Sequence, residues 1–264
     1  MPPKILVISG PTASGKTRLA VELALRHGGE VVSADSMQVY RRMDIGTAKP
    51  TPEEMRGIPH HMLDVADPEE DFSVARYVEL AAPCVDDILA RGKLPIVAGG
   101  TGLYLDSLLS GRTFAPFSPD GGLRARLEAR FDALGGEAML GELAAADPEA
   151  AARLHPNDRK RIVRALEVFQ QTGKTISQHN RETRALPLRY DALTLSLAFQ
   201  RREDMWARID RRVDEMMAAG LAEEVRALLD SGVPARCTAM QAIGYKEMAA
   251  ALRGGGDVCA AAEE

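Results

Sequence analysis

Cysteine is scarce in this 264-residue sequence, which contains only Cys84, Cys237 and Cys259. The three are widely spaced and form no C-x-x-C pair, so we expect neither a zinc site nor a disulfide framework. They are expected to be small apolar residues in a reducing compartment. His60 and His61 have no partner at metal-ligand spacing, and we expect them to be structural.

Long apolar runs are also lacking. No stretch approaches the roughly 18 residues of a membrane span. The apolar run at residues 5–8 is too short for a signal peptide and leads into a glycine-rich turn. We therefore expect a cytoplasmic monomer without a membrane partner. Its length allows one α/β domain with a smaller module.

Positive charge is in deficit overall, since the net charge is −5, yet it is concentrated in one stretch. Residues 153–189 hold nine basic and three acidic residues, which gives this stretch +6 and leaves −11 for the rest of the chain. The basic residues are Arg153, Arg159, Lys160, Arg161, Arg164, Lys174, Arg181, Arg184 and Arg189. A local basic field suits a polyanion such as nucleic acid. Charge alone allows an ordinary solvated helix face equally well.

Strand and helix patterns alternate on both sides of a long helical stretch. We expect strands at 4–9, 31–34, 94–98 and 190–199, and helices at 17–27, 72–90 and 206–216. Pro83 is expected to break or kink the second helix. Between these parts, helical spacing recurs at 123–134, 138–145 and 158–172, with Gly173 suited to a helix C-cap. The order predicts a parallel sheet covered by helices on both faces, interrupted by a helical insert.

The strongest motif is a complete GxxxxGK[ST] directly after the first expected strand. It consists of Gly10, Pro11, Thr12, Ala13, Ser14, Gly15, Lys16 and Thr17. Such a loop turns successive N–H groups toward phosphate oxygens, the lysine adds a full charge, and the hydroxyl of Thr17 suits Mg²⁺. The fold class expected is therefore α/β and P-loop NTPase-like, with a core at 1–111 and 185–264 and a helical insert at 112–184.

The loop binds a diphosphate without saying which molecule carries it. The strand at 94–98 ends in Gly99-Gly100-Thr101, without the carboxylate that NTPases use to hold Mg²⁺. Asp35 instead ends the strand after the P-loop helix, where it can accept a proton from a nucleophile or simply cap the next helix. Thr101 suits a leaving oxygen, although a structural turn fits its glycine-rich context equally well.

Two arginine pairs share helix faces. Arg208 and Arg212 lie four residues apart and suit either a diphosphate clamp or surface ion pairs, and the spacing does not decide which one meets the diphosphate. Arg161 and Arg164 suit the phosphates of a nucleotide, as in a kinase lid, or those of an RNA backbone.

These segments together resemble the tRNA dimethylallyltransferase family. The matching stretches are 10–17, 35–40, 46–50, 57–61, 99–104, 155–158, 161–167 and 241–247, and they cover nearly the whole chain. Asp35-Ser-Met-Gln-Val-Tyr40 together with the P-loop is the specific combination, because ordinary P-loop kinases lack it.

The resemblance implies transfer of a dimethylallyl group from dimethylallyl diphosphate to N6 of the adenosine next to the anticodon (position 37) in tRNA. It implies that Asp35 takes the proton, and that Thr101 with Arg208 or Arg212 and Mg²⁺ stabilises the departing diphosphate. The implied tRNA contacts are Asp35, Ser36, Met37, Gln38, Thr101, Arg124, Arg159, Lys160, Arg161 and Arg164. The anticodon stem-loop would be gripped by the helical insert.

Three alternatives remain open from the residues alone. They are a small-molecule or nucleoside kinase, an adenylate isopentenyltransferase acting on free nucleotide, and a non-catalytic RNA-binding protein. The sequence also departs from the family near its end, where residues 254–264 stand in place of a basic helix followed by aromatic residues. We expect this departure to weaken tRNA binding.

Overall fold

The computed structural model describes residues 2–111, 122–254 and 256. The chain divides into two compact units, a core unit of residues 1–109 and 188–264 and a helical unit of residues 110–187. The sequence patterns placed the corresponding junctions after residues 111 and 184. None of the described helices has the length and apolar character of a membrane span.

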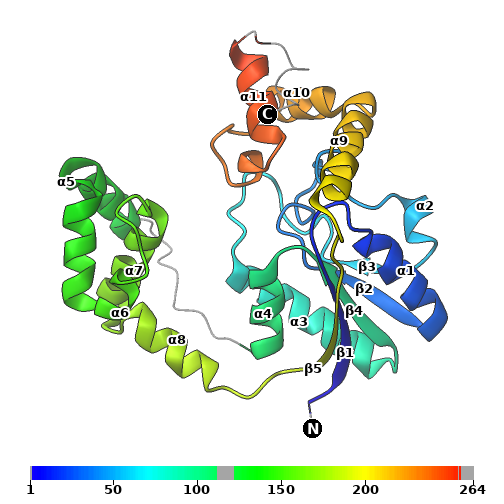
Figure 1. The fold of residues 1–264 in the computed structure, drawn as a ribbon, viewed down its shortest axis with the longest axis horizontal. Coiled ribbons are helices and arrows are strands. Elements are labelled where there is room, and N and C mark those ends of the chain that lie inside the picture. Colours follow the sequence, from blue (N-terminus) through cyan, green and yellow to red (C-terminus); the bar gives the residue numbers. More distant parts are fainter. Residues whose placement is uncertain (1, 112–121, 255, 257–264) are drawn as a thin grey trace. The chain divides into compact units, whose positions relative to one another are not determined.

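The core unit is built on five parallel strands in the order β3-β2-β4-β1-β5 (Figure 1). They are β1 (Lys4–Ser9), β2 (Gly29–Ser33), β3 (His60–His61), β4 (Leu94–Gly99) and β5 (Asp191–Ser196). In register, Leu6 of the central strand β1 lies opposite Ile96 of β4 and Leu193 of β5. The α/β class with a P-loop NTPase-like parallel sheet is thus confirmed, and the short edge strand β3 is the one that the sequence patterns missed.

Helices cover both faces of the central strands. On one face Leu6, Val31 and Ile96 pack against α1 (Lys16–His27). Alternate residues of a strand point to opposite faces. The equally buried Val7, Val32 and Val97 therefore face the side covered by α3 (Val74–Ala90). Because these strands are buried on both faces, they read in the sequence as continuous apolar runs.

The expected break at Pro83 does not occur, since α3 runs through it from Val74 to Ala90. A proline at this position leaves the carbonyl of Glu79 without its helical partner. Pro83 and Glu79 both lie on the exposed face of the helix, so that carbonyl is not enclosed in the core. The buried face, with Tyr77, Ala81 and Val85, stays packed and holds the helix together.

The rest of the core unit is helical. It comprises α2 (Pro52–Met55), α4 (Gly102–Ser110), α9 (Arg202–Ala218), α10 (Leu221–Asp230), the 3-10 helix η1 (Ala239–Gln241) and α11 (Tyr245–Gly254). Glu224 of α10 fastens these C-terminal helices to the loop after β2. Its carboxylate accepts the backbone N–H groups of Asp44 at 2.8 Å, Ile45 at 2.9 Å and Gly46 at 3.2 Å, and the phenol of Tyr245. Burial raises the pKa of Tyr245, so this phenol stays protonated and donates.

The helical unit contains α5 (Gly122–Ala146), α6 (Pro148–Ala151), α7 (Arg159–Thr172) and α8 (Ile176–Arg184). Gly135, at φ 80°, interrupts α5, so the two separate helices expected there are confirmed. Gly173, at φ 70°, caps α7 as expected. The unit has its own core, in which Leu127, Met139 and Leu143 of α5 pack against Ile162 and Leu166 of α7, the last two on the buried side of that amphipathic helix.

We predict that Glu224→Ala lowers the free energy of unfolding by about 3 kcal/mol, because it leaves partly buried donors without their charged acceptor. Urea denaturation measures the change. Glu223→Ala is the matched control, since this neighbour on α10 is exposed and lies 3.8 Å from its basic partner Arg226. The control is expected to stay within about 0.5 kcal/mol of the parent. Equal losses in the two variants would contradict the anchoring role of Glu224.

Candidate active site

The P-loop connects β1 to α1 as a turn with unusual backbone conformations. Gly15 has φ 87° and Ala13 has φ 61°, and such left-handed residues turn N–H groups toward a common centre. At Gly10 a Cβ would lie 2.8 Å from the carbonyl oxygen of Leu197, so the loop requires glycine there. Lys16 Nζ donates to the carbonyl of Pro11 at 2.7 Å. Burial lowers the pKa of Lys16, while the charge of Asp35 opposes this shift.

Asp35 follows β2, at the same edge of the sheet as the P-loop. Its Oδ1 accepts the backbone N–H of Met37 at 2.8 Å and of Gln38 at 3.3 Å. In the described part of the chain, Oδ2 accepts no hydrogen bond. Asp35 therefore does cap the following turn, and it keeps one oxygen available for chemistry.

Thr101 ties the turn after β4 to the turn after β2. Its Oγ1 accepts the N–H of Ser36 at 3.1 Å, and its own N–H donates to the carbonyl of Ala34 at 3.2 Å. The strands approach so closely here that a Cβ on Gly99 would lie 2.1 Å from the Ala34 oxygen. Asp35 and Thr101, 66 positions apart in sequence, are thus neighbours in space.

Gln38, a predicted tRNA contact, directs its side chain into the protein. Its amide nitrogen donates to the carbonyls of Thr47 at 3.2 Å and Ala48 at 3.1 Å, and its amide oxygen accepts the hydroxyl of Ser33 at 3.0 Å. These bonds hold the loop after β2 in place. Any contact of residue 38 with RNA stays a prediction.

The two arginines of α9 differ sharply. Arg208 is exposed, donates to the carbonyl of Ala13 at 3.3 Å and lies 5.9 Å from the ring centre of Phe199. Arg212 is half-buried, and its Nε is fully buried without a hydrogen-bond partner within the described residues. Burial lowers the pKa of Arg212, against the charges of Asp35, Glu54 and Glu215. Arg212 in turn lowers the pKa of Lys16, so the two cations share one region.

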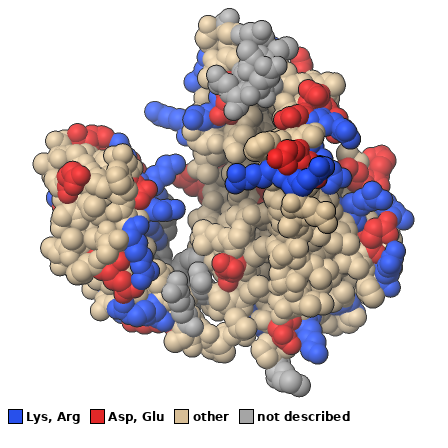
Figure 2. Space-filling view, viewed as in Figure 1, with Lys and Arg blue, Asp and Glu red and all other residues tan. Residues whose placement is uncertain are grey.

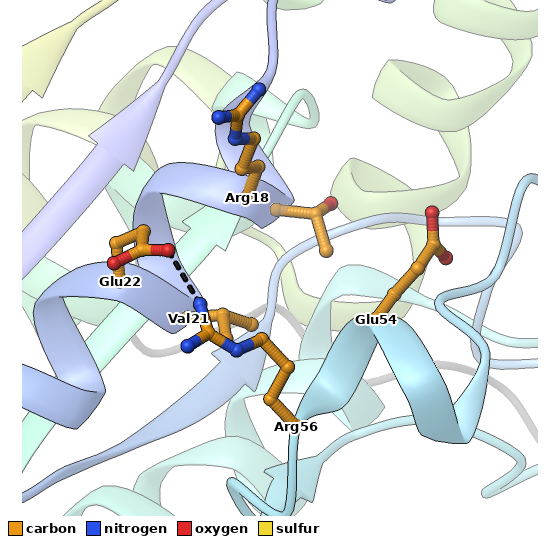
Figure 3. Close-up of a pocket in the computed structure, with 6 residues that line it drawn as sticks. Arg18, Val21, Glu22, Glu54 and Arg56 are labelled. Carbon is orange, nitrogen blue, oxygen red and sulfur yellow. Dashed lines mark hydrogen bonds and ion pairs between the residues drawn. The ribbon is translucent and has the colours of Figure 1, made fainter.

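A cavity of about 350 Å³ adjoins the P-loop helix (Figure 3). Its lining residues are Thr17, Arg18, Val21, Glu22, Glu54 and Arg56. Glu54 escaped the sequence analysis. The only local signal is a capping box at the start of α2, in which the side chain of Glu54 accepts the N–H of Thr51 at 3.0 Å.

The predicted tRNA contacts of the helical unit fall into two groups. Arg124 and Arg164 bind the buried carboxylate of Glu167, at 2.9 and 2.7 Å, and Arg159 is paired with Asp132. Lys160 and Arg161 are exposed on α7 and have no acidic partner within 4 Å in the described ranges. Figure 2 shows the resulting mixture of basic and acidic side chains on this unit. The free positive charge is therefore smaller than the sequence count suggests.

The catalytic candidates Asp35 and Thr101 and the P-loop residue Lys16 thus meet at the edge where parallel strands end, and the catalytic candidate Arg212 is close enough to affect the pKa of Lys16. A family model described as IPP transferase matches residues 38–264, and one described as isopentenyl transferase matches residues 3–70. The chain belongs to the IPP transferase family. This membership confirms the resemblance carried by the motifs and favours prenyl transfer over the kinase alternative.

Several members of the IPP transferase family are close relatives. A tRNA dimethylallyltransferase 1 from Trichlorobacter lovleyi is 52% identical over 96% of this chain and 83% of its own length. A tRNA dimethylallyltransferase from Acetivibrio thermocellus is 48% identical over 95% of this chain and 80% of its own length.

Solved structures of similar enzymes resemble this chain as well. A tRNA delta(2)-isopentenylpyrophosphate transferase from Staphylococcus epidermidis has a TM-score of 0.68 at 42% identity, covering 99% of this chain and 84% of its own. A eukaryotic dimethylallyltransferase acting on tRNA has a TM-score of 0.83 at 32% identity. The match covers 99% of this chain and 65% of the eukaryotic chain. The names of these proteins favour the tRNA-modifying interpretation over an enzyme acting on free nucleotide.

We predict that Gly99→Ala lowers the free energy of unfolding by about 3 kcal/mol, because the added methyl group overlaps the backbone of Ala34. Gly100→Ala is the control, since its Cβ would meet nothing closer than 3.7 Å. Thermal denaturation of the two variants measures the difference. A Gly99→Ala protein as stable as the control would disprove the close approach of the two turns.

Proposed function

We propose that this enzyme transfers the dimethylallyl group of dimethylallyl diphosphate to N6 of adenosine 37 in the anticodon stem-loop of tRNA and releases diphosphate. One observation in the core unit carries the proposal. Asp35, a carboxylate with a free oxygen, lies within electrostatic reach of Lys16 and Arg212. Neither cation has a carboxylate within 4 Å among the described residues. A proton acceptor thus adjoins two cations that have no ion-pair partner among the described residues.

The charges of this site suit the chemistry. N6 forms a bond to the allylic carbon, the carbon–oxygen bond breaks, and its electron pair leaves with the diphosphate. We assign the N6 proton to Asp35 Oδ2, which accepts no hydrogen bond within the described chain. Lys16, Arg212 and the P-loop N–H groups would stabilise the growing charge of the leaving group.

Mg²⁺ is the cofactor we propose, and the hydroxyl of Thr17 fits it. Mg²⁺ takes oxygen ligands and keeps several waters. The protein therefore needs to supply few ligands when a diphosphate supplies others, and the hydroxyl of Thr17 is one such ligand. When bound, Mg²⁺ would supply further neutralisation of the diphosphate. Thr101 is proposed to act beside it as a hydroxyl donor to the departing oxygen.

For the RNA we propose that Lys160 and Arg161 contact backbone phosphates, because both are exposed at the start of α7 and have no acidic partner within 4 Å among the described residues. Arg124, Arg159 and Arg164 are already ion-paired with Glu167 or Asp132. They would contact RNA phosphates only while also contacting these carboxylates. An adenine in an anticodon loop must leave its stack to reach a pocket, and single-stranded loops permit this.

We predict that Asp35→Asn lowers the rate of adduct formation roughly 100- to 10,000-fold, because asparagine keeps the turn but cannot accept the proton. Mass spectrometry of a digested anticodon stem-loop, after incubation with dimethylallyl diphosphate and Mg²⁺, measures the adduct on adenosine. Asp67→Asn, which alters an exposed ion pair with Arg41, is the control. An undiminished rate in Asp35→Asn would overturn the assigned base. Adduct on AMP but not on the stem-loop would overturn tRNA as substrate.

We also predict that Arg212→Ala raises the dissociation constant of inorganic pyrophosphate by about tenfold or more, since a half-buried cation is lost from the anion site. Arg208→Ala is expected to raise it less, because Arg208 is exposed and already bonded to the loop carbonyl of Ala13. Isothermal titration calorimetry measures both constants. The reverse order of effects would assign the diphosphate contact to Arg208.

A further inference from the structure

The cavity beside the P-loop helix holds two carboxylates in different situations. Glu22 is paired with Arg56 at 2.5 Å, as the dashed line in Figure 3 shows. Glu54 has no lysine, arginine or histidine within 4 Å in the described parts of the chain. Its Oε2 accepts the N–H of Thr51, which leaves Oε1 unused. Of the two carboxylates that line this cavity, Glu54 is therefore the one without an ion-pair partner within 4 Å among the described residues.

Glu54 shares this cavity with Thr17, the hydroxyl expected to bind Mg²⁺. The negative charge of Glu54 also opposes the lowering of the pKa of Arg212 by burial, so Glu54 acts electrostatically on this arginine. Glu54 and Thr17 thus offer one carboxylate and one hydroxyl to the same cavity.

The usual carboxylate for such a cation is missing, because β4 ends in glycine and threonine. Asp35, the acid at the neighbouring strand end, has one oxygen bound by Met37 and Gln38 and the other assigned to proton transfer. The described residues contain no group of three His, Cys, Asp or Glu side chains that holds a metal by itself. A cation here would thus depend on substrate phosphates, which is how Mg²⁺ is commonly held, with one or two carboxylates and several waters.

We propose that Glu54 supplies the carboxylate of the Mg²⁺ site whose hydroxyl is Thr17. This inference rests on the proposed function, because the diphosphate provides the remaining charge. In this proposal a carboxylate on α2 takes the place of the acid that other P-loop enzymes have at the end of the strand corresponding to β4. The loop after β2 leads to α2, and Glu54 of α2 lines the same cavity as Thr17 of the P-loop.

The test uses inorganic pyrophosphate as the probe, titrated calorimetrically into the protein with and without Mg²⁺. Glu54→Gln is the variant, because glutamine preserves the capping box with Thr51 while removing the charge. Glu53→Gln is the matched control, since it removes the same charge from the same helix at a residue that does not line the cavity. Mg²⁺ is expected to increase the affinity for pyrophosphate. We expect Glu54→Gln to raise the Mg²⁺ concentration that gives half of this increase by about tenfold or more. Glu53→Gln should match the parent.

The outcomes separate three explanations. Equal Mg²⁺ dependence in Glu54→Gln and the parent would overturn the metal site. Altered pyrophosphate binding by Glu54→Gln without Mg²⁺, and unchanged Mg²⁺ dependence, would overturn it in favour of an action through Arg212. Failure of the parent to bind pyrophosphate in either condition would contradict the proposed function itself. Circular dichroism of each variant confirms that it is folded.

Discussion

The close approach of the turns after β2 and β4 is the contact on which the rest of the site depends. Because β2, β4 and β1 are parallel neighbours, their carboxyl ends meet at one edge of the sheet. Gly99 allows the backbones to touch, and Thr101 then bonds to Ala34 and Ser36. Asp35 is consequently held against the turn after β4, and this turn follows the strand that lies between β2 and β1, the strand before the P-loop. A side chain at Gly99 would separate these turns and move the carboxylate away from Lys16.

Desolvated positive charge is the second constraint. Burial lowers the pKa of both Lys16 and Arg212, which means that the folded protein bears a cost for keeping them charged. Asp35, Glu54 and Glu215 offset part of this cost at Arg212 from beyond ion-pair distance. A diphosphate would offset the remainder, and its charge rises as the allylic bond breaks. The site is therefore suited to the leaving group more than to a neutral ligand.

Local signals could be predicted from the sequence, whereas long-range pairings could not. The P-loop, the interruption near Gly135 and the cap at Gly173 depend on residues within a few positions of one another, so spacing alone reveals them. Glu224 and Gln38 hold the loop after β2 through bonds to backbone groups, which carry no residue-type signal. Glu167 likewise looked like one of three scattered acids in a basic stretch, and its burial between Arg124 and Arg164 depends on the packing of α5 against α7. That the helix continues through Pro83 could not be predicted, because the outcome depended on which helix face is exposed.

The loop between β2 and α2 shows how rigidity arises without regular structure. It carries Asp35 at one end and leads to Glu54 at the other, so its shape determines the distance between the proposed base and the proposed metal carboxylate. Lys49 is 6% exposed and joins Asp44, Asp64 and the carbonyl of Tyr40 in one cluster. Glu224 holds the adjacent turn from outside. Side-chain hydrogen bonds and ion pairs thus replace a strand or helix here. They hold in place the segment that carries both the proposed base and the proposed metal carboxylate.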